Sequence, residues 1–347
     1  MTTRRALYLN YVIKRDVRID ILRALAIFCI ILAHTAPIET IFIIRNFDVT
    51  LMAFLMGASF YLSNQKHGGY AYGNYLIKRF NRLVLPAWKF LVCFFILFYV
   101  LSLLLSESFY FSYENILKSF LMIQGETYMW ILAVFFMVAL VSPFVLQISN
   151  RIKSNLVYFI MLVGAYLTYH YIIIIFNESI SNTQIQELFQ NFIVNGIGYS
   201  LVAAIGIRLY KIDKNKLLLI SSLFLLLFIT LSIYHDFTPI QTFKYPPSIY
   251  YFSYGLFVSM LLFYLLSFDK IKSMFNFKFT IWLSTNSLLL YYYHTIPIYL
   301  LKFQGDYLPK WIEMNFVTRF IFLFGFALVM VFIHNIVKKK IPKTKHS

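Results

Sequence analysis

Charged residues are scarce in this sequence. Only 13% of its 347 residues are Asp, Glu, Lys or Arg, whereas 60% are hydrophobic. A soluble domain normally carries about 25% charged and about 45–50% apolar residues, so no soluble core could bury this much apolar surface. The composition therefore excludes an ordinary soluble protein and makes a lipid bilayer part of the solvent.

Cysteine and linker residues are also rare. Cys29 and Cys93 both lie in apolar runs, so we expect buried thiols and no disulfide framework. The sequence has no Gly-rich linker, internal repeat or low-complexity tract, and the longest expected outer loop covers only 106–127. These absences favour one membrane domain over 1–347, with cytoplasmic segments at 1–18 and 338–347.

The net charge of +17 raises the question of nucleic-acid binding. The basic residues are scattered through short segments between apolar runs, and they do not form one stripe with interleaved aromatic residues. We therefore expect membrane lipids, and no nucleic acid, among the partners. The distribution of the charges is instead typical of a signal for membrane orientation.

Apolar runs of about 17–25 residues are long enough to span a bilayer as α-helices. The sequence contains about ten such runs, which predicts an all-α fold with one bundle of transmembrane helices. The expected spans are 19–38, 47–63, 83–105, 128–148, 156–176, 192–210, 217–234, 249–268, 279–301 and 316–337.

The Lys and Arg residues test this number of spans. With the N-terminus inside, 23 of the 31 basic residues fall in inner segments and 6 in outer segments, while Arg23 and Lys89 lie inside spans. The positive-inside rule requires such an alternation, and one span more or fewer would scramble it. We therefore expect both termini in the cytoplasm. Arg23 and the lack of a small-x-small cleavage site argue against a signal peptide in the first span.

One arginine and one histidine stand out in the first expected span. Arg23 lies within this span, near its inner end, and a charge within a membrane span is costly. His34 follows eleven residues later, close to three helical turns, so the two side chains share one helix face about 16 Å apart. His34 then lies in the outer half of the membrane. The alternative is an inner charge anchor with an incidental histidine.

Arg79 and Arg82 lie just before the third expected span, on the cytoplasmic side. Because they are three residues apart, they face the same way on a helix. The fork of an arginine side chain suits phosphate oxygens, which makes the pair a candidate phosphate clamp. The alternative is simple anchoring at the inner membrane surface.

A second histidine, His294, follows Tyr293 in the outer half of the ninth span. The alternative is a histidine that only packs among aromatic rings. Neither His34 nor His294 has Asp, Glu or Cys at metal-ligand spacing nearby, so we expect no metal site. Glu126, just before the fourth span, is a candidate to orient a histidine, and the alternative is a solvated loop carboxylate.

Several short motifs occur in an order that resembles one known family. The motifs are Arg23 followed by His34, the segment 54–60 (FLMGASF), the segment 78–86 (KRFNRLVLP), Trp130 with Ile131 and Leu132, and the segment 290–297 (LYYYHTIP). Together with the expected spans, they resemble the type 3 membrane acyltransferase family over essentially the whole chain.

This resemblance implies an O-acyltransferase in a bacterial cytoplasmic membrane. It implies transfer of an acyl group, usually acetyl, from cytoplasmic acyl-CoA to an extracytoplasmic sugar of a surface polysaccharide or lipid-linked glycan. The expected donor is acetyl-CoA, and no metal is expected. By this resemblance, the candidate site residues are Arg23 and His34 for catalysis and Arg79 and Arg82 for the donor. Candidate residues on the acceptor side are Glu126, Trp130, Tyr293 and His294.

The sequence departs from the family pattern in one respect that bears on the chemistry. Longer members have Trp-Ser-Leu-x-x-Glu in the fourth helix, whereas Trp130 is followed by 131–135 without a carboxylate. The hydrolase-like domain that some members append is also missing. Which group supplies a carboxylate to His34 is therefore open, as is whether His34 acts as a base or carries the acyl group.

The alternative function is a polysaccharide exporter or flippase without acyl-transfer activity. Such proteins are also polytopic and rich in aromatic residues, but they need a wide polar path through the bundle. The expected spans hold few polar groups, and those present form an Arg and His set. A secondary transporter is a weaker alternative, because paired broken helices and a clear inverted repeat are lacking in the sequence pattern.

Overall fold

The structure, a computed structural model, describes residues 15–64, 72–123, 126–179, 186 and 188–340. Most of the expected segment 1–18 and the end of the basic tail, 341–347, lie outside these residues. Helices make up 84% of the structure, and no strand occurs among the described residues. The predicted all-α fold is therefore confirmed.

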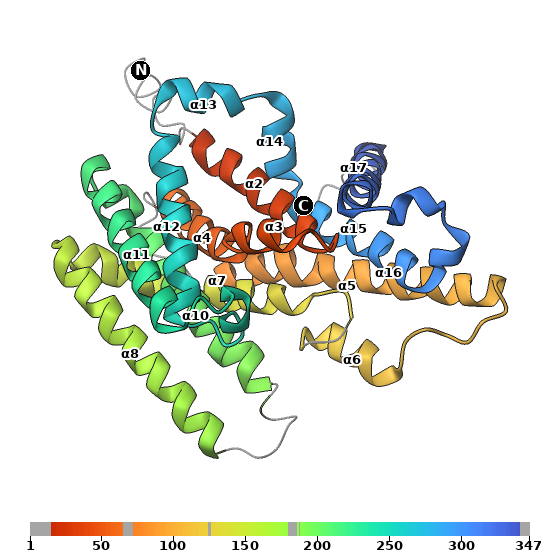
Figure 1. The fold of residues 1–347 in the computed structure, drawn as a ribbon, viewed down its shortest axis with the longest axis horizontal. Helices are drawn as coiled ribbons and strands as arrows, with labels where there is room; N and C mark the ends of the chain where they lie inside the picture. The colour runs from red at the N-terminus through yellow and green to blue at the C-terminus, as the bar shows by residue number, and fades with distance from the viewer. Residues whose placement is uncertain (1–14, 65–71, 124–125, 180–185, 187, 341–347) are drawn as a thin grey trace, which may run out of the picture.

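The helices form one bundle, with the long α5 extending past it on one side (Figure 1). In chain order they are α2 (Val17–Ala33), α3 (Glu39–Ile44), α4 (Asp48–Asn64), α5 (Tyr72–Leu104), α6 (Tyr113–Leu121), α7 (Trp130–Arg151), α8 (Asn155–Ser179), the π-helical turn η1 (Phe189–Val194), α10 (Asn195–Arg208), η2 (Leu209–Lys211), α11 (Lys214–Tyr234), η3 (Ile240–Phe243), α12 (Ile249–Leu265), α13 (Asp269–Phe275), α14 (Lys278–Thr285), α15 (Ser287–Tyr293), α16 (Thr295–Gln304), η4 (Gly305–Tyr307), η5 (Lys310–Glu313) and α17 (Phe316–Lys340).

In the described parts of the chain, 7 helical segments are long and apolar enough to cross a membrane. They comprise α3 with α4, α5, α7, α8, η1 with α10 and η2, α11, and α17. The pair α12 and α13, bent by 102°, counts as an eighth. Of the other two expected spans, 19–38 holds α2, whose 17 residues are at the lower end of the spanning range. The total of ten therefore stays a prediction, whereas a multi-pass helical membrane fold is established.

The ninth expected span, 279–301, is not one continuous helix. It consists of α14, α15 and α16, which are separated at Asn286 and at His294. Pro297 lies three residues beyond His294 and has no backbone N–H, so it cannot donate a hydrogen bond to the preceding turn. The sequence pattern predicts a single helix because all three pieces are apolar. The break leaves His294 at a helix end rather than in a helix interior.

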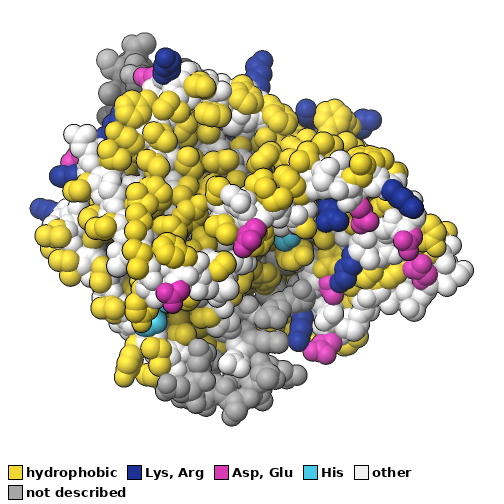
Figure 2. Space-filling view, viewed as in Figure 1, with side chains coloured by type: hydrophobic (Ala, Val, Ile, Leu, Met, Phe, Trp, Pro, Cys, Tyr) yellow, Lys and Arg dark blue, Asp and Glu magenta, His cyan; other side chains and the backbone are white. Residues whose placement is uncertain are grey.

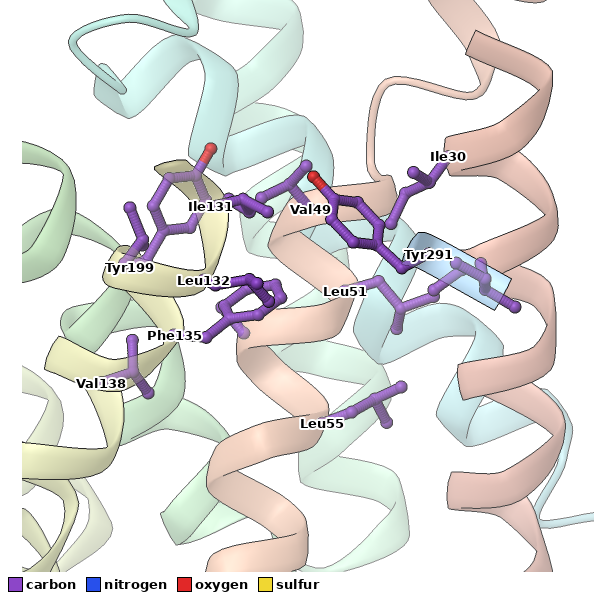
Figure 3. Packing of buried hydrophobic residues seen from close by; sticks show 14 of the residues in the cluster. Ile30, Val49, Leu51, Leu55, Ile131, Leu132, Phe135, Val138, Tyr199 and Tyr291 are labelled. Carbon is purple, nitrogen blue, oxygen red and sulfur yellow. The ribbon is translucent and has the colours of Figure 1, made fainter. Parts of the chain in front are cut away.

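Helix α4 lies at the centre of the bundle and packs against α2, α7, α10 and α12. Figure 3 shows α4 between α7 and α2, with Leu51 and Leu55 among the side chains that fill the core. Towards α10 the contact is so close that a Cβ atom on Gly57 would clash with the backbone carbonyl of Ala203. Gly206 on α10 meets α4 in the same way. Small residues allow membrane helices to approach this closely, so α4 packs tightly against α10.

Other helices expose their apolar side chains. In α8, α11 and α17 only 17% of the most hydrophobic stretch is buried, against 78% in the segment that contains α10. Hydrophobic side chains accordingly cover much of the molecular surface (Figure 2). Since water would not tolerate so much exposed apolar surface, these helices face lipid.

The orientation of the chain can be tested at the two ends of α7. Lys118 precedes this helix and Lys153 follows it. From the partition of basic residues, we expect a topology reporter fused after Lys118 to be extracytoplasmic and one fused after Lys153 to be cytoplasmic. Alkaline phosphatase and green fluorescent protein fusions measure the two sides. The same side for both positions would contradict the predicted orientation.

Candidate active site

A cavity of about 1280 Å³ runs through the bundle. Its walls come from α2, α4, α5, α7, α15, α17 and the loop between α11 and α12. Along α2 the lining extends from Ile19 to His34, about 22 Å of helix axis at 1.5 Å per residue. That is most of the roughly 30 Å of a bilayer's hydrocarbon core. The cavity therefore connects the side predicted to face the cytoplasm with the side predicted to face outwards.

The inner end of the cavity is lined by arginine. Arg15 donates to both carboxylate oxygens of Asp20, which also accepts a hydrogen bond of 2.7 Å from Ser284. Arg23 extends from α2 towards α4, where its Nη2 donates to Ser59 Oγ over 2.9 Å. Arg23 and His34 both line the cavity, so the predicted shared helix face is confirmed.

Arg79 and Arg82 line the same end of the cavity from α5. The guanidinium group of Arg79 lies over the ring of Tyr75, 5.0 Å from its centroid. Among the described residues, neither arginine forms an ion pair with a carboxylate. Two guanidinium groups thus reach the cavity with their charge uncompensated, which is the arrangement that binds a phosphate group.

At the outer end of the cavity, His34 packs against the second histidine singled out in the sequence, His294, which does not itself line the cavity. The ring centroids of His34 and His294 are 5.3 Å apart, and the ring of Tyr128 lies 4.3 Å from that of His34. His294 is fully buried, and its Nδ1 lies 2.6 Å from the carbonyl oxygen of Tyr291. A carbonyl oxygen only accepts, so this nitrogen carries the proton. The Nε2 atom of His294 is then a lone-pair acceptor, and it has no partner among the described residues.

Two of the other expected acceptor-side residues, Trp130 and Tyr293, lie in different places. Trp130 begins α7 and lines the outer end of the cavity, where its ring meets the edge of Tyr245 at 5.0 Å. Tyr293 is not part of the lining. It turns towards α17, where its hydroxyl group lies 2.8 Å from Nδ1 of His334. Trp130 therefore stays in the site on geometric grounds, and Tyr293 does not.

Glu126 lies away from both histidines. It does not line the cavity, and its carboxylate accepts hydrogen bonds from the hydroxyl group of Tyr299 and, over 3.2 Å, from Nδ2 of Asn115. The carboxylate is thus occupied in holding the loop before α7 against α16. The structure offers the buried Nε2 of His294, rather than Glu126, as the neighbouring acceptor for His34.

A group of charged residues at the outer end was missed in the sequence. The carboxylate of Asp48 pairs with Arg45 at 2.7 Å and with Lys244 at 3.7 Å, and all three line the cavity. Burial lowers the pKa of Lys244, but its neighbours Tyr245, Tyr251 and Asp48 together raise it above the usual value, so the amine is charged. Burial also raises the pKa of nearby Tyr245 to about 12, so its phenol is neutral. One feature of the sequence could have indicated this group. Few basic residues lie in the predicted outer segments, so each one that does lie there is a candidate for a specific role.

The middle of the cavity is apolar. By their positions along α2, α4, α7 and α15, the lining residues between the two ends include Ile30, Met52, Met56, Phe135 and Leu289. The cavity thus has three parts: a cationic inner end, an apolar middle and a polar outer end that His34 lines.

Comparison with known proteins fits this arrangement. Neither the curated proteins nor the solved structures gave a match to this chain. A family model described as an acyltransferase domain matches residues 16–335. The match covers almost the whole chain, including both ends of the cavity. The resemblance drawn from the motifs is therefore confirmed, and the chain belongs to the acyltransferase 3 family.

Proposed function

We propose that the protein transfers an acyl group, usually acetyl, from cytoplasmic acetyl-CoA to a hydroxyl group of an extracytoplasmic glycan. The observation that carries this proposal is the cavity, which joins Arg23, Arg79 and Arg82 at its inner end to His34 at its outer end, where His294 packs beside His34. In this proposal the chain lies in the cytoplasmic membrane of a bacterium with both termini inside. The acceptor is a sugar of a surface polysaccharide or of a lipid-linked glycan.

The inner end suits the polar part of the donor. The phosphate groups of acetyl-CoA bind to Arg79 and Arg82, whose guanidinium groups have no carboxylate partner among the described residues. Arg23, tethered to Ser59, lies further along the cavity on the way to the histidines. The uncharged pantetheine arm then extends through the apolar middle, and the thioester reaches the outer end.

The outer end supplies the base that acyl transfer requires. The acceptor's hydroxyl oxygen attacks the thioester carbonyl carbon, a C–O bond forms and the C–S bond breaks. His34 takes the proton of the hydroxyl group and returns it to the departing thiolate, so CoA leaves as a thiol. Imidazole suits this step because its unprotonated nitrogen accepts the proton and, once protonated, donates it again.

His294 orients His34 in this mechanism. Its Nδ1 proton is held by the carbonyl group of Tyr291, which leaves Nε2 as an acceptor beside the ring of His34. When one ring nitrogen of His34 donates a hydrogen bond to Nε2 of His294, the other ring nitrogen is free to take the proton of the sugar's hydroxyl group. This arrangement gives His34 an orienting partner in the absence of the carboxylate that longer relatives carry.

The apolar middle of the cavity weighs against the alternative of a polysaccharide exporter. A sugar chain that crosses the membrane needs hydrogen-bonding groups along its whole path, because unsatisfied hydroxyl groups are costly in an apolar setting. Ile30, Met52 and Phe135 offer none. A thin, uncharged pantetheine arm has only two amide groups and one hydroxyl group, so its penalty is much smaller than that of a sugar chain.

Mass spectrometry of surface glycans from cells with and without the protein tests the function. We expect each repeat unit of the acceptor glycan to carry one more acetyl group when the protein is present. The matched control is a strain that produces the His34→Gln protein at the same level. Unmodified glycan that accumulates inside the cell when the protein is missing would instead identify an exporter.

A further inference from the structure

The outer end of the cavity holds an uncompensated positive charge. Arg45 and Lys244 share one carboxylate, that of Asp48, at 2.7 Å and 3.7 Å. The side chains are 5%, 6% and 2% exposed, respectively, so water screens them little. Among the described residues, no second carboxylate pairs with either cation. Two positive charges and one negative charge leave an excess of one.

Such an excess is unfavourable unless something balances it. Lys244 also donates to Oδ1 of Asn46 over 3.5 Å, but a neutral amide does not balance its charge, and a buried excess charge is costly. The outer segments contain only six of the chain's 31 Lys and Arg residues, yet two of them meet at this point. A purely structural ion pair would need one cation for one carboxylate.

Unpaired polar atoms accompany the excess charge. Nε of Arg45, Nδ2 of Asn46 and Oε1 of Gln241 are buried, and none has a hydrogen-bond partner in the described part of the chain. Arg45 and Gln241 line the cavity together with Lys244 and Tyr245. Buried polar groups are nearly always satisfied, so these atoms mark hydrogen-bonding positions that a ligand can occupy.

We propose that this cluster binds an anionic group, a carboxylate or phosphate, on the acceptor sugar. The inference rests on the proposed function and adds the acceptor's chemical class: an acidic glycan. Arg45 and Lys244 hold the anion, and the amide of Gln241 and the ring of Trp130 contact the neutral part of the sugar. Arg45, Lys244 and His34 line the same cavity, so an anion held by the two cations places a neighbouring hydroxyl group near the base.

The same cluster selects against neutral sugars. A neutral sugar leaves the excess charge unbalanced, and its hydroxyl groups make weaker hydrogen bonds to a guanidinium group than a carboxylate does. Specificity therefore comes from the cost of leaving the cations unpaired as well as from the hydrogen bonds that an acidic sugar accepts.

Binding to the purified protein in detergent, without acetyl-CoA, tests the proposal. The probes are glucuronic acid, glucose 6-phosphate, glucose and inorganic phosphate, each titrated and followed by saturation-transfer NMR. We expect at least one of the two acidic sugars to bind about 10- to 100-fold more tightly than glucose, which corresponds to one charge-assisted hydrogen bond. The preferred acid identifies the anion as carboxylate or phosphate. Glucose bound as tightly as both acids would overturn the proposal, as would inorganic phosphate bound as tightly as the preferred sugar.

Variants assign the effect to the cluster. Lys244→Gln should remove the preference for the acidic sugar, and Lys244→Arg should keep most of it because the charge remains. The matched control is Lys302→Gln, which removes an exposed basic residue of the same predicted outer side that does not line the cavity. An unchanged preference in folded Lys244→Gln protein contradicts the proposal. If that variant does not fold, the wild-type titrations still decide.

The acidic-sugar site and the acyltransferase function can be tested independently of each other. Sugar binding is measured without donor, so the acidic preference can hold even if no acyl transfer is found. Conversely, acyl transfer to neutral and acidic glycans with equal KM would overturn the acidic site and leave the acyltransferase function intact.

Discussion

Replacing His34 with Gln is expected to lower acyl transfer by about 100- to 10,000-fold, the usual contribution of a general base. Glutamine keeps a similar size and hydrogen-bonding capacity, but its amide cannot take up and release a proton near neutral pH. A packing histidine would tolerate the change. His34 lines the cavity and is only half-buried, so the new side chain fits without repacking the core. Transfer of radiolabelled acetyl groups from acetyl-CoA to purified glycan measures the loss.

His294→Gln is the internal control for this experiment. In the proposed mechanism His294 orients the base but does not exchange a proton with the substrate, so we expect a smaller loss. Thermal melts of both purified variants exclude a destabilised bundle as the cause. Activity of His34→Gln within a few-fold of the wild type would show that His34 is structural. Acetylated His34 after incubation with donor alone would show that the histidine carries the acyl group.

Loss of either arginine of the pair on α5 is expected to weaken donor binding by about 10- to 100-fold, the value of a charge-assisted hydrogen bond. Arg79→Ala and Arg82→Ala each remove one guanidinium group from the inner end of the cavity, and the double variant should lose more than either. Lysine at these positions should rescue binding only in part, because it lacks the planar fork. Titration of acetyl-CoA into the purified proteins measures the effect.

Lys78→Ala provides the matched control for this pair. Lys78 is exposed, neighbours Arg79 on the same helix and does not line the cavity. Its loss removes one positive charge from the same membrane surface and should leave donor affinity within a few-fold. Equal affinity in the wild type and in both arginine variants would exclude the phosphate clamp and leave the arginines as anchors at the inner surface.

The sequence predicted the features that depend on one helix at a time. The apolar runs identified the membrane fold, and the helical period placed Arg23 and His34 on one face, as the cavity confirms. The meeting of His34 with His294 agrees with the expected outer half of each span, although the sequence could not give their distance.

Features that depend on several segments were not predictable. Asp48 begins α4, whereas Lys244 lies almost 200 residues later in the loop before α12. Nothing in the local pattern of either segment indicates that they form an ion pair. Hydropathy likewise predicted one helix over 279–301, because a break at a polar residue does not change the average hydropathy of the run. Glu126 was a reasonable partner for His34 by sequence position, but the loop turns its carboxylate towards Tyr299.

The apolar middle of the cavity has a consequence for the permeability of the membrane. A water-filled passage from one side to the other would let protons and ions leak and would dissipate the potential that the cell maintains. Narrow hydrophobic stretches tend to empty of water, and a hydrated ion cannot enter a dry one without losing its shell. The Met52, Met56 and Leu289 side chains therefore place an apolar stretch in the path, which opposes the passage of a hydrated ion. Methionine side chains are flexible, so they can move aside for a slender uncharged chain and close again behind it.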